Sequence, residues 1–88
     1  MAGQLEDRVA VITGAGEGIG RGIASAFVKE GAKVVIAEIN AELGNAAVSE
    51  LGENAIFVET DVSVKEDNER MIAAAVDQWG TLDILSLI

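Results

Sequence analysis

Short apolar runs alternate with segments of helical periodicity along the whole chain. Four runs rich in valine and isoleucine predict strands, at residues 8–13, 32–39, 55–59 and 82–88. The segments between them place apolar side chains three and four positions apart, which predicts helices at residues 18–31, 40–52 and 63–80. The expected order of elements is therefore βαβαβαβ.

Each predicted helix has an apolar face and a signal at its ends. The faces consist of Ile19, Ile23, Ala26 and Phe27 in the first helix, Leu43, Ala47 and Leu51 in the second, and Ile72, Val76 and Trp79 in the third. Asn40 is expected to cap the second helix, because its side-chain oxygen can accept from a free backbone N–H. Ser63 and Glu66 have the spacing of a capping box for the third helix.

These elements predict a single α/β domain over residues 1–88, with no second domain. Strands joined through helices are parallel, and their crossovers are right-handed. Apolar side chains fall on both faces of the strands, which is typical of a sheet covered by helices on both sides. We expect an open, doubly wound parallel sheet in the order 3-2-1-4, with the first two helices on one face and the third on the other.

Glycine occupies the start of the first predicted helix, at positions 14, 16, 18, 20 and 22. Glycine is a poor helix former, so this clustering needs a reason other than propensity. A loop without side chains can turn sharply and bring backbone N–H groups to a pyrophosphate at a helix N-terminus. Gly20 and Gly22 would also let the helix lie close to the sheet. The alternative is a tight turn with a purely structural role.

The spacing of this segment is T-G-x-x-x-G-I-G, carried by Thr13, Gly14, Gly18, Ile19 and Gly20. It resembles the coenzyme loop of the short-chain dehydrogenases/reductases, and the likeness extends to GTLDIL before the last strand. The resemblance implies the N-terminal part of a Rossmann-like dinucleotide-binding domain, truncated after the fourth strand. The cofactor-binding residues that it implies are Gly14, Gly16, Glu17, Gly18, Ile19, Gly20, Glu38, Ile39, Asp61 and Val62.

Glu38 stands at the end of the second predicted strand. A carboxylate at this point accepts hydrogen bonds from the ribose hydroxyls of NAD and repels the 2′-phosphate of NADP. Glu17 adds a second negative charge, and no Lys or Arg lies between Glu38 and Lys65. We therefore expect NAD in preference to NADP. The alternative for Glu38 is a solvated strand end.

Asp61 and Val62 follow the third predicted strand within the sequence TDVS. In the family that the sequence resembles, a similar Asp-Val pair borders the adenine, and the carboxylate accepts from the exocyclic amine. The alternative is that Asp61 caps or precedes the third helix.

The chain contains no tyrosine, histidine or cysteine. The resembled family oxidises alcohols or reduces ketones by hydride transfer, using a Tyr, a Lys and a Ser from the second half of its fold, so we assign no catalytic residue and no metal site here. After the last strand the family continues as Asn-Asn-Ala-Gly, whereas this chain has Ser86, Leu87 and Ile88. A catalytically inactive nucleotide-binding module and a truncated structural fragment are the alternative functions.

The formal net charge is −9, from 15 acidic and 6 basic residues. Such a surface disfavours nucleic acids and anionic membranes as partners. The absence of cysteine, of a long apolar run and of a secretory signal leads us to expect a cytoplasmic protein. The apolar fourth strand would form an exposed sheet edge, so we expect a homo-oligomer, most simply a two-fold dimer, through this edge or through an uncovered sheet face.

Overall fold

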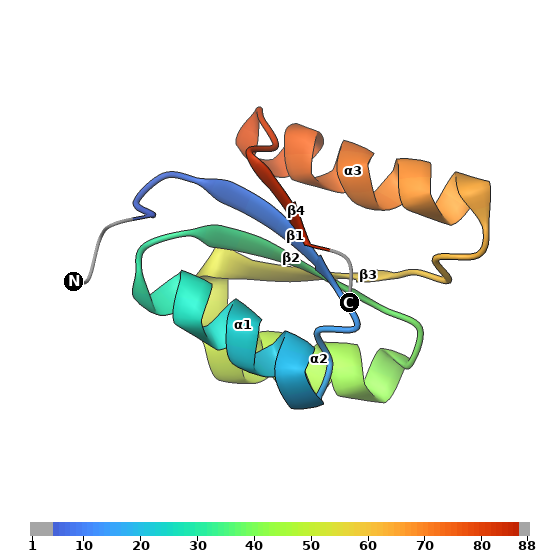
Figure 1. Cartoon of the computed structure of the whole chain (residues 1–88), viewed down its shortest axis with the longest axis horizontal. Helices are drawn as coiled ribbons and strands as arrows, with labels where there is room; N and C mark the ends of the chain where they lie inside the picture. The colour runs from blue at the N-terminus through green and yellow to red at the C-terminus, as the bar shows by residue number, and fades with distance from the viewer. Residues whose placement is uncertain (1–4, 87–88) are drawn as a thin grey trace.

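The computed structural model describes residues 5–86, which form one four-stranded parallel sheet with helices on both faces (Figure 1). The strands are β1 (Val9–Thr13), β2 (Lys33–Glu38), β3 (Ala55–Glu59) and β4 (Ile84–Ser86). Their order across the sheet is β3-β2-β1-β4. The predicted fold class and strand order are therefore confirmed. The predicted fourth strand extended to residue 88, and its last two residues lie outside the described range.

The helices lie on the faces that the crossover rule assigns to them. They are α1 (Gly18–Lys29), α2 (Ala41–Leu51) and α3 (Lys65–Trp79), and a short 3-10 helix, η1 (Gly52–Asn54), leads into β3. Figure 1 shows α1 and α2 together on one side of the sheet and α3 alone on the other. None of the helices within residues 5–86 has the length and apolarity that a bilayer-spanning segment requires.

Alternation along the strands divides the core into two apolar layers. All five residues of β1 are buried, because β1 has a strand on each side and helices on both faces. The layer under α1 and α2 is built on Ala10, Ile12, Val34, Ile36 and Ala55. The layer under α3 is built on Val9, Val11, Val35 and Ala37. Burial of this apolar surface is the main favourable term for the fold.

The predicted apolar face of α3 is wrong by one position. Met71 and Ala75 are the buried residues of α3, whereas Ile72 and Val76 are 37% and 45% exposed. Trp79 packs against the same layer, as predicted. The buried pair and the exposed pair both have the four-residue spacing that a helical face requires, so spacing alone does not distinguish them. The rotation of α3 is set by how closely it docks on the sheet, and the small Ala75 permits the closer approach.

The predicted face of α1 also needs correction, because its buried residues are Gly20 and Ala24. Ile23 and Phe27 pack against the core as predicted, but Ile19 is 77% exposed and Ala26 is also exposed. Small residues let α1 lie close to the chain beneath it, and Ile19 at the start of the helix points to solvent.

The three helices begin in three different ways. Asn40 caps α2 as predicted, its Oδ1 accepting from Leu43 N–H at 3.1 Å. The capping box predicted at Ser63 and Glu66 is wrong, because α3 begins at Lys65 with Val64 in the cap position and no side-chain cap. Ser63 is engaged elsewhere, in the turn that precedes α3. At the start of α1 no side chain caps the helix either.

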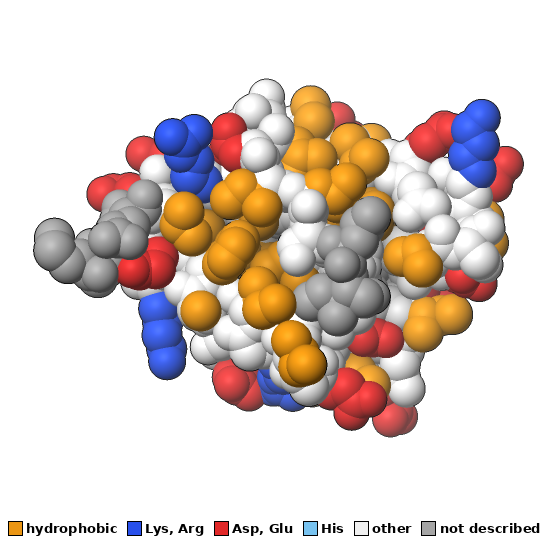
Figure 2. All heavy atoms as spheres, viewed as in Figure 1, with side chains coloured by type: hydrophobic (Ala, Val, Ile, Leu, Met, Phe, Trp, Pro, Cys, Tyr) orange, Lys and Arg blue, Asp and Glu red, His pale blue; other side chains and the backbone are white. Residues whose placement is uncertain are grey.

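The β4 strand forms one edge of the sheet and is partly uncovered. Leu85 pairs in register with Val11, so both side chains point to the face that carries α3. However, α3 contacts β1, β2 and β3, and leaves Leu85 45% exposed. Figure 2 shows hydrophobic side chains gathered over α3 and β4 on this side of the molecule.

Candidate functional site

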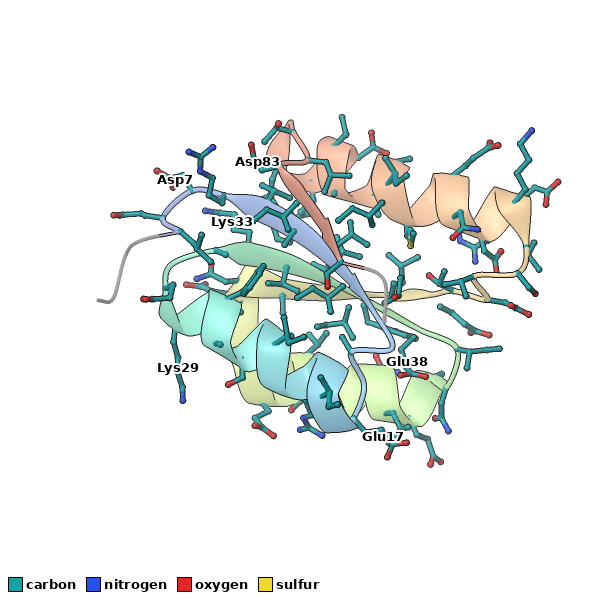
Figure 3. All side chains as sticks on the ribbon, viewed as in Figure 1. Asp7, Glu17, Lys29, Lys33, Glu38 and Asp83 are labelled. Carbon is teal, nitrogen blue, oxygen red and sulfur yellow. The ribbon has the colours of Figure 1, made fainter. Side chains whose placement is uncertain are left out.

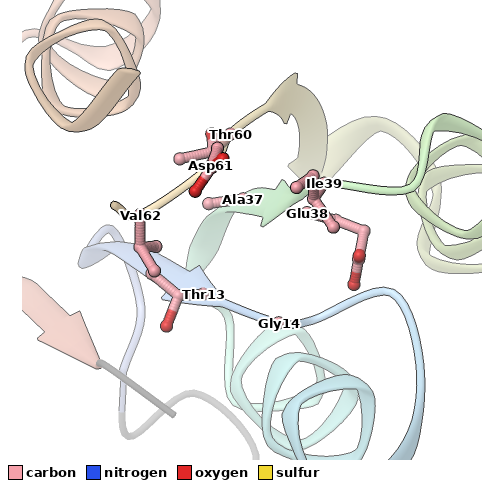
Figure 4. A pocket seen from close by; sticks show the side chains of 8 residues that line it. All are labelled: Thr13, Gly14, Ala37, Glu38, Ile39, Thr60, Asp61 and Val62. Carbon is pink, nitrogen blue, oxygen red and sulfur yellow. The ribbon is translucent and has the colours of Figure 1, made fainter. Parts of the chain in front are cut away.

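A cavity of about 180 Å³ opens at the carboxyl ends of β1, β2 and β3 (Figure 4). Its lining residues are Thr13, Gly14, Ala37, Glu38, Ile39, Thr60, Asp61 and Val62. Open α/β sheets bind ligands in such a crevice, because the loops that leave the carboxyl ends of parallel strands diverge there. Pockets for whole drug-sized ligands measure about 300–1,000 Å³, so this cavity fits one part of a dinucleotide.

The glycine-rich turn between β1 and α1 borders the cavity. Gly14 and Gly18 both have φ of +63°, a left-handed conformation that glycine adopts without steric cost. A side chain at Gly20 would collide with the backbone of Gly14, whose carbonyl carbon would lie 2.8 Å from the new Cβ. Gly20 therefore packs the start of α1 against its own loop. Gly22, in contrast, has open space around it, so its predicted role in close packing is wrong.

Glu38 ends β2 with a buried side chain that is 8% exposed. Its Oε1 accepts from Gly16 N–H at 3.1 Å, and its Oε2 accepts from Asn40 N–H at 3.0 Å. A side chain at Gly16 would come within 2.7 Å of Oε1, so glycine there is what admits the carboxylate. The alternative of a solvated strand end is wrong. A carboxylate accepts about four hydrogen bonds, so about two of its lone pairs remain for a ligand.

The charge around the cavity is negative. Figure 3 shows Glu17 and Glu38 at the same end of the molecule, with Lys33, Asp7 and Asp83 at the opposite end. None of the chain's six Lys and Arg residues lines the cavity. Arg21, the basic residue nearest in sequence to the glycine-rich turn, forms an ion pair with Glu50 of α2.

Asp61 and Val62 form the wall of the cavity opposite Glu38. Asp61 Oδ1 accepts from Ser63 N–H at 2.9 Å and from Ser63 Oγ–H at 2.6 Å. These bonds, chiefly that from the Ser63 hydroxyl, hold the pKa of Asp61 below its ordinary value. Asp61 is therefore an anionic acceptor at neutral pH, and within residues 5–86 its Oδ2 has no hydrogen-bond partner. It stabilises the turn ahead of α3, but the cap position itself belongs to Val64.

Two apolar side chains are exposed on the rim of the cavity. Ile39 is 60% exposed and Val62 is 54% exposed, and they come from the loops after β2 and β3 respectively. Exposed apolar side chains next to a crevice are typical of a ligand-binding surface.

The structure brings together five of the ten predicted cofactor-binding residues in the cavity lining, namely Gly14, Glu38, Ile39, Asp61 and Val62. Gly16 contacts Glu38, and Glu17, Gly18, Ile19 and Gly20 lie at the turn into α1. Three further residues line the cavity: Thr13, which the sequence analysis placed in the coenzyme-loop motif but not among the ten cofactor-binding residues, and Ala37 and Thr60, which it did not identify. Their signal was positional, since each lies at or next to the last residue of a parallel strand. Within residues 5–86 no three acidic side chains are grouped as metal ligands.

A profile of the short chain dehydrogenase family matches residues 8–87. Sorbitol dehydrogenase of Cereibacter sphaeroides is 43% identical over 82 residues, which cover 93% of this chain and 32% of that protein. Tropinone reductase-like 1 of Erythroxylum coca is 43% identical over 82 residues, covering 93% of this chain and 30% of its own length.

Among solved structures, the 3-ketoacyl-(acyl-carrier-protein) reductase of Brucella melitensis complexed with NADH superposes with a TM-score of 0.90. It is 41% identical and covers 93% of this chain and 34% of its own. This chain spans about a third of the length of these proteins.

Proposed function

The chain belongs to the short-chain dehydrogenase family, and from that premise we propose that it is the NAD(H)-binding N-terminal portion of an oxidoreductase that interconverts alcohols and ketones. The observation that carries this proposal is the buried, doubly hydrogen-bonded carboxylate of Glu38 beside a glycine-rich helix start. The two backbone N–H groups offset part of the cost of burying this carboxylate, and Glu38 also lines the cavity.

The adenine, the adenosine ribose and the pyrophosphate of the coenzyme each have a matching group in this site. The uncapped N-terminus of α1 would receive the pyrophosphate, because its N–H groups and dipole favour an anion. Glu38 would accept from the adenosine ribose hydroxyls. Ile39 and Val62 would contact the adenine, and Asp61 would accept from its exocyclic amine. The family match makes both alternatives, a catalytically inactive nucleotide-binding module and a truncated structural fragment, less favoured.

The bound nicotinamide supplies the hydride chemistry of such an enzyme. The residues of this chain bind and orient the nucleotide. We assign none of them a proton-transfer role, because the sequence contains no tyrosine and, among residues 5–86, the lining of the cavity includes no serine or lysine.

We propose that NAD(H) is bound in preference to NADP(H). Calorimetric titration of the 88-residue chain is expected to give saturable NADH binding and at least about tenfold weaker NADPH binding, a difference of about 1.4 kcal/mol. The reason is the negative charge of Glu38 and Glu17 and the lack of Lys or Arg in the cavity lining. Equal affinities would contradict the preference. No binding of either coenzyme by a folded sample would contradict the proposed function itself.

We also propose that the chain forms a two-fold dimer through β4, with the exposed Leu85, Ile72 and Val76 at or near the contact. An edge strand with unpaired backbone groups and an adjoining apolar surface is a site of association. Multi-angle light scattering at micromolar concentration is expected to give twice the chain mass of 9.1 kDa. Leu85→Glu is expected to shift the sample to monomer. A wild-type monomer would refute the dimer.

The predicted cytoplasmic location stays a prediction, which cell fractionation would test.

A further inference from the structure

The wall of the cavity that carries Asp61 and Val62 lies beyond the end of the sheet. Thr60 N–H donates to Glu38 O at 3.0 Å, which ties the end of β3 to β2. The two residues that follow lie outside the strand pairing. Their positions therefore depend on contacts other than the β-ladder. Some lie within the turn, where Ser63 donates to the Asp61 carboxylate and Val64 N–H donates to Asp61 O at 2.9 Å, and the others come from α3.

Asp67, in the first turn of α3, binds the backbone of this wall directly. Its Oδ2 accepts from Asp61 N–H at 2.9 Å. Its Oδ1 lies 3.1 Å from Arg70 Nη2, and the same Arg70 nitrogen donates to Glu59 O at 2.6 Å. Asp67 and Arg70 thus hold backbone groups on both sides of Thr60, and the first two turns of α3 clamp the chain as it leaves β3.

Asn68, the next residue of α3, adds a further contact to the same segment. Its Nδ2 donates to Val62 O at 2.8 Å and to Val64 O at 3.2 Å. The carbonyl of Val62 is thereby directed toward α3. The Val62 side chain is 54% exposed at the cavity rim.

From these contacts we propose that Asp67 is a positioning residue for the nucleotide, which acts through Asp61 to fix the adenine-side wall of the cavity. This inference rests on the proposed function, since it assumes that Asp61 meets the adenosine part of a coenzyme. Asp67 lines no part of the cavity itself. Its carboxylate is 20% exposed, and a charged acceptor at this degree of burial makes a stronger bond to an N–H than a neutral one.

Loss of the Asp67 side chain would release the segment of Asp61 and Val62 without detaching α3 from the sheet. The helix is held to the sheet by the packing of Met71 and Ala75, whereas the Asp67 carboxylate binds Asp61 N–H and Arg70. Asp61 would keep its own bonds to Ser63, so its carboxylate would remain charged. What changes is the position of that carboxylate relative to Glu38 across the cavity.

The test is calorimetric titration of the 88-residue chain with ADP and with NADH. Asp67→Ala is expected to weaken both about tenfold, the size of one lost charge-assisted hydrogen bond. Asp67→Asn is expected to retain most of the affinity, because its amide oxygen can still accept from Asp61 N–H. Glu66→Ala removes the same charge from the same helix turn and is expected to bind as the wild type does. Titrations are made at a temperature where circular dichroism shows every variant folded.

A double-mutant cycle with Asp61→Ala separates positioning from general destabilisation. If Asp67 acts through Asp61, then adding Asp67→Ala to the Asp61→Ala variant lowers its affinity for ADP by less than about twofold. A full tenfold loss in both backgrounds would overturn the proposal, and so would wild-type affinity of Asp67→Ala alone. If the wild-type chain binds neither ADP nor NADH, the proposed function fails, and this inference fails with it.

Discussion

The Gly44→Ala substitution is expected to lower the free energy of unfolding by about 1–3 kcal/mol, although alanine is the better helix former by about 1 kcal/mol. Gly44 is buried in α2, and an added Cβ would collide with one edge of the ring of Phe57 on β3, 2.8 Å from its Cζ. Either the core is overpacked or the ring is expelled. Thermal unfolding followed by circular dichroism is expected to show a midpoint lowered by about 5–20 °C.

The matched control is Gly22→Ala, which makes the same chemical change in an exposed part of α1. Its added Cβ meets nothing within 4 Å, so only helix propensity acts. We expect a gain of about 0.5–1 kcal/mol, the opposite sign to Gly44→Ala. A Gly44→Ala chain as stable as the wild type would show that the Phe57 ring adapts at no cost. Phe57→Leu in the Gly44→Ala background is expected to recover part of the loss, because leucine leaves space for the methyl group.

The Glu38→Ala substitution is expected to weaken NADH binding about 10- to 100-fold, since a hydrogen bond to a charged group contributes about 1.5–3 kcal/mol. Binding of NADPH is expected to change little or to improve, because the same substitution removes a negative charge from beside its 2′-phosphate. Calorimetric titration of the wild-type and Glu38→Ala chains with NADH and with NADPH measures both changes in affinity.

The selectivity of the Glu38 effect distinguishes a lost ligand contact from local unfolding. Removing the carboxylate also leaves the N–H groups of Gly16 and Asn40 without its oxygens, and unfolding of the loop would weaken both coenzymes alike. Glu53→Ala, in the exposed η1 helix, removes one negative charge at the amino end of β3, whereas the cavity lies at the carboxyl ends of the strands. It is expected to leave both affinities unchanged. Parallel loss of NADH and NADPH binding in Glu38→Ala would count against the ribose contact.

Local patterns in the sequence, with the family resemblance that they carry, were sufficient for the architecture and for five of the eight cavity-lining residues. Chain connectivity makes the strands parallel and the crossovers right-handed. The order β3-β2-β1-β4 is that of the dinucleotide-binding fold, which the glycine-rich turn indicated. Parallel strands carry their ligands at their carboxyl ends, which is why Glu38 could be identified from its place in the chain, whereas Asp61 was implied by the family resemblance.

These sequence patterns did not predict how the helices and strands pack against one another. Met71 and Ala75 are four residues apart in α3, and so are Ile72 and Val76. Only the packing of α3 on the sheet decides which pair is buried. The reason for Gly44 lies 13 residues away, in the ring of Phe57. Gly22 is also a glycine inside a helix, yet an added Cβ there would meet open space.

The sequence by itself determined the βαβαβαβ order, the parallel sheet and the glycine-rich turn, because these depend on periodicity and spacing along the chain. Only the tertiary structure decided that Gly16 makes room for Glu38 and that α3 holds Asp61 through Asp67. A hydrogen bond requires two atoms within about 3 Å, and the fold alone brings together groups that lie 22 residues apart.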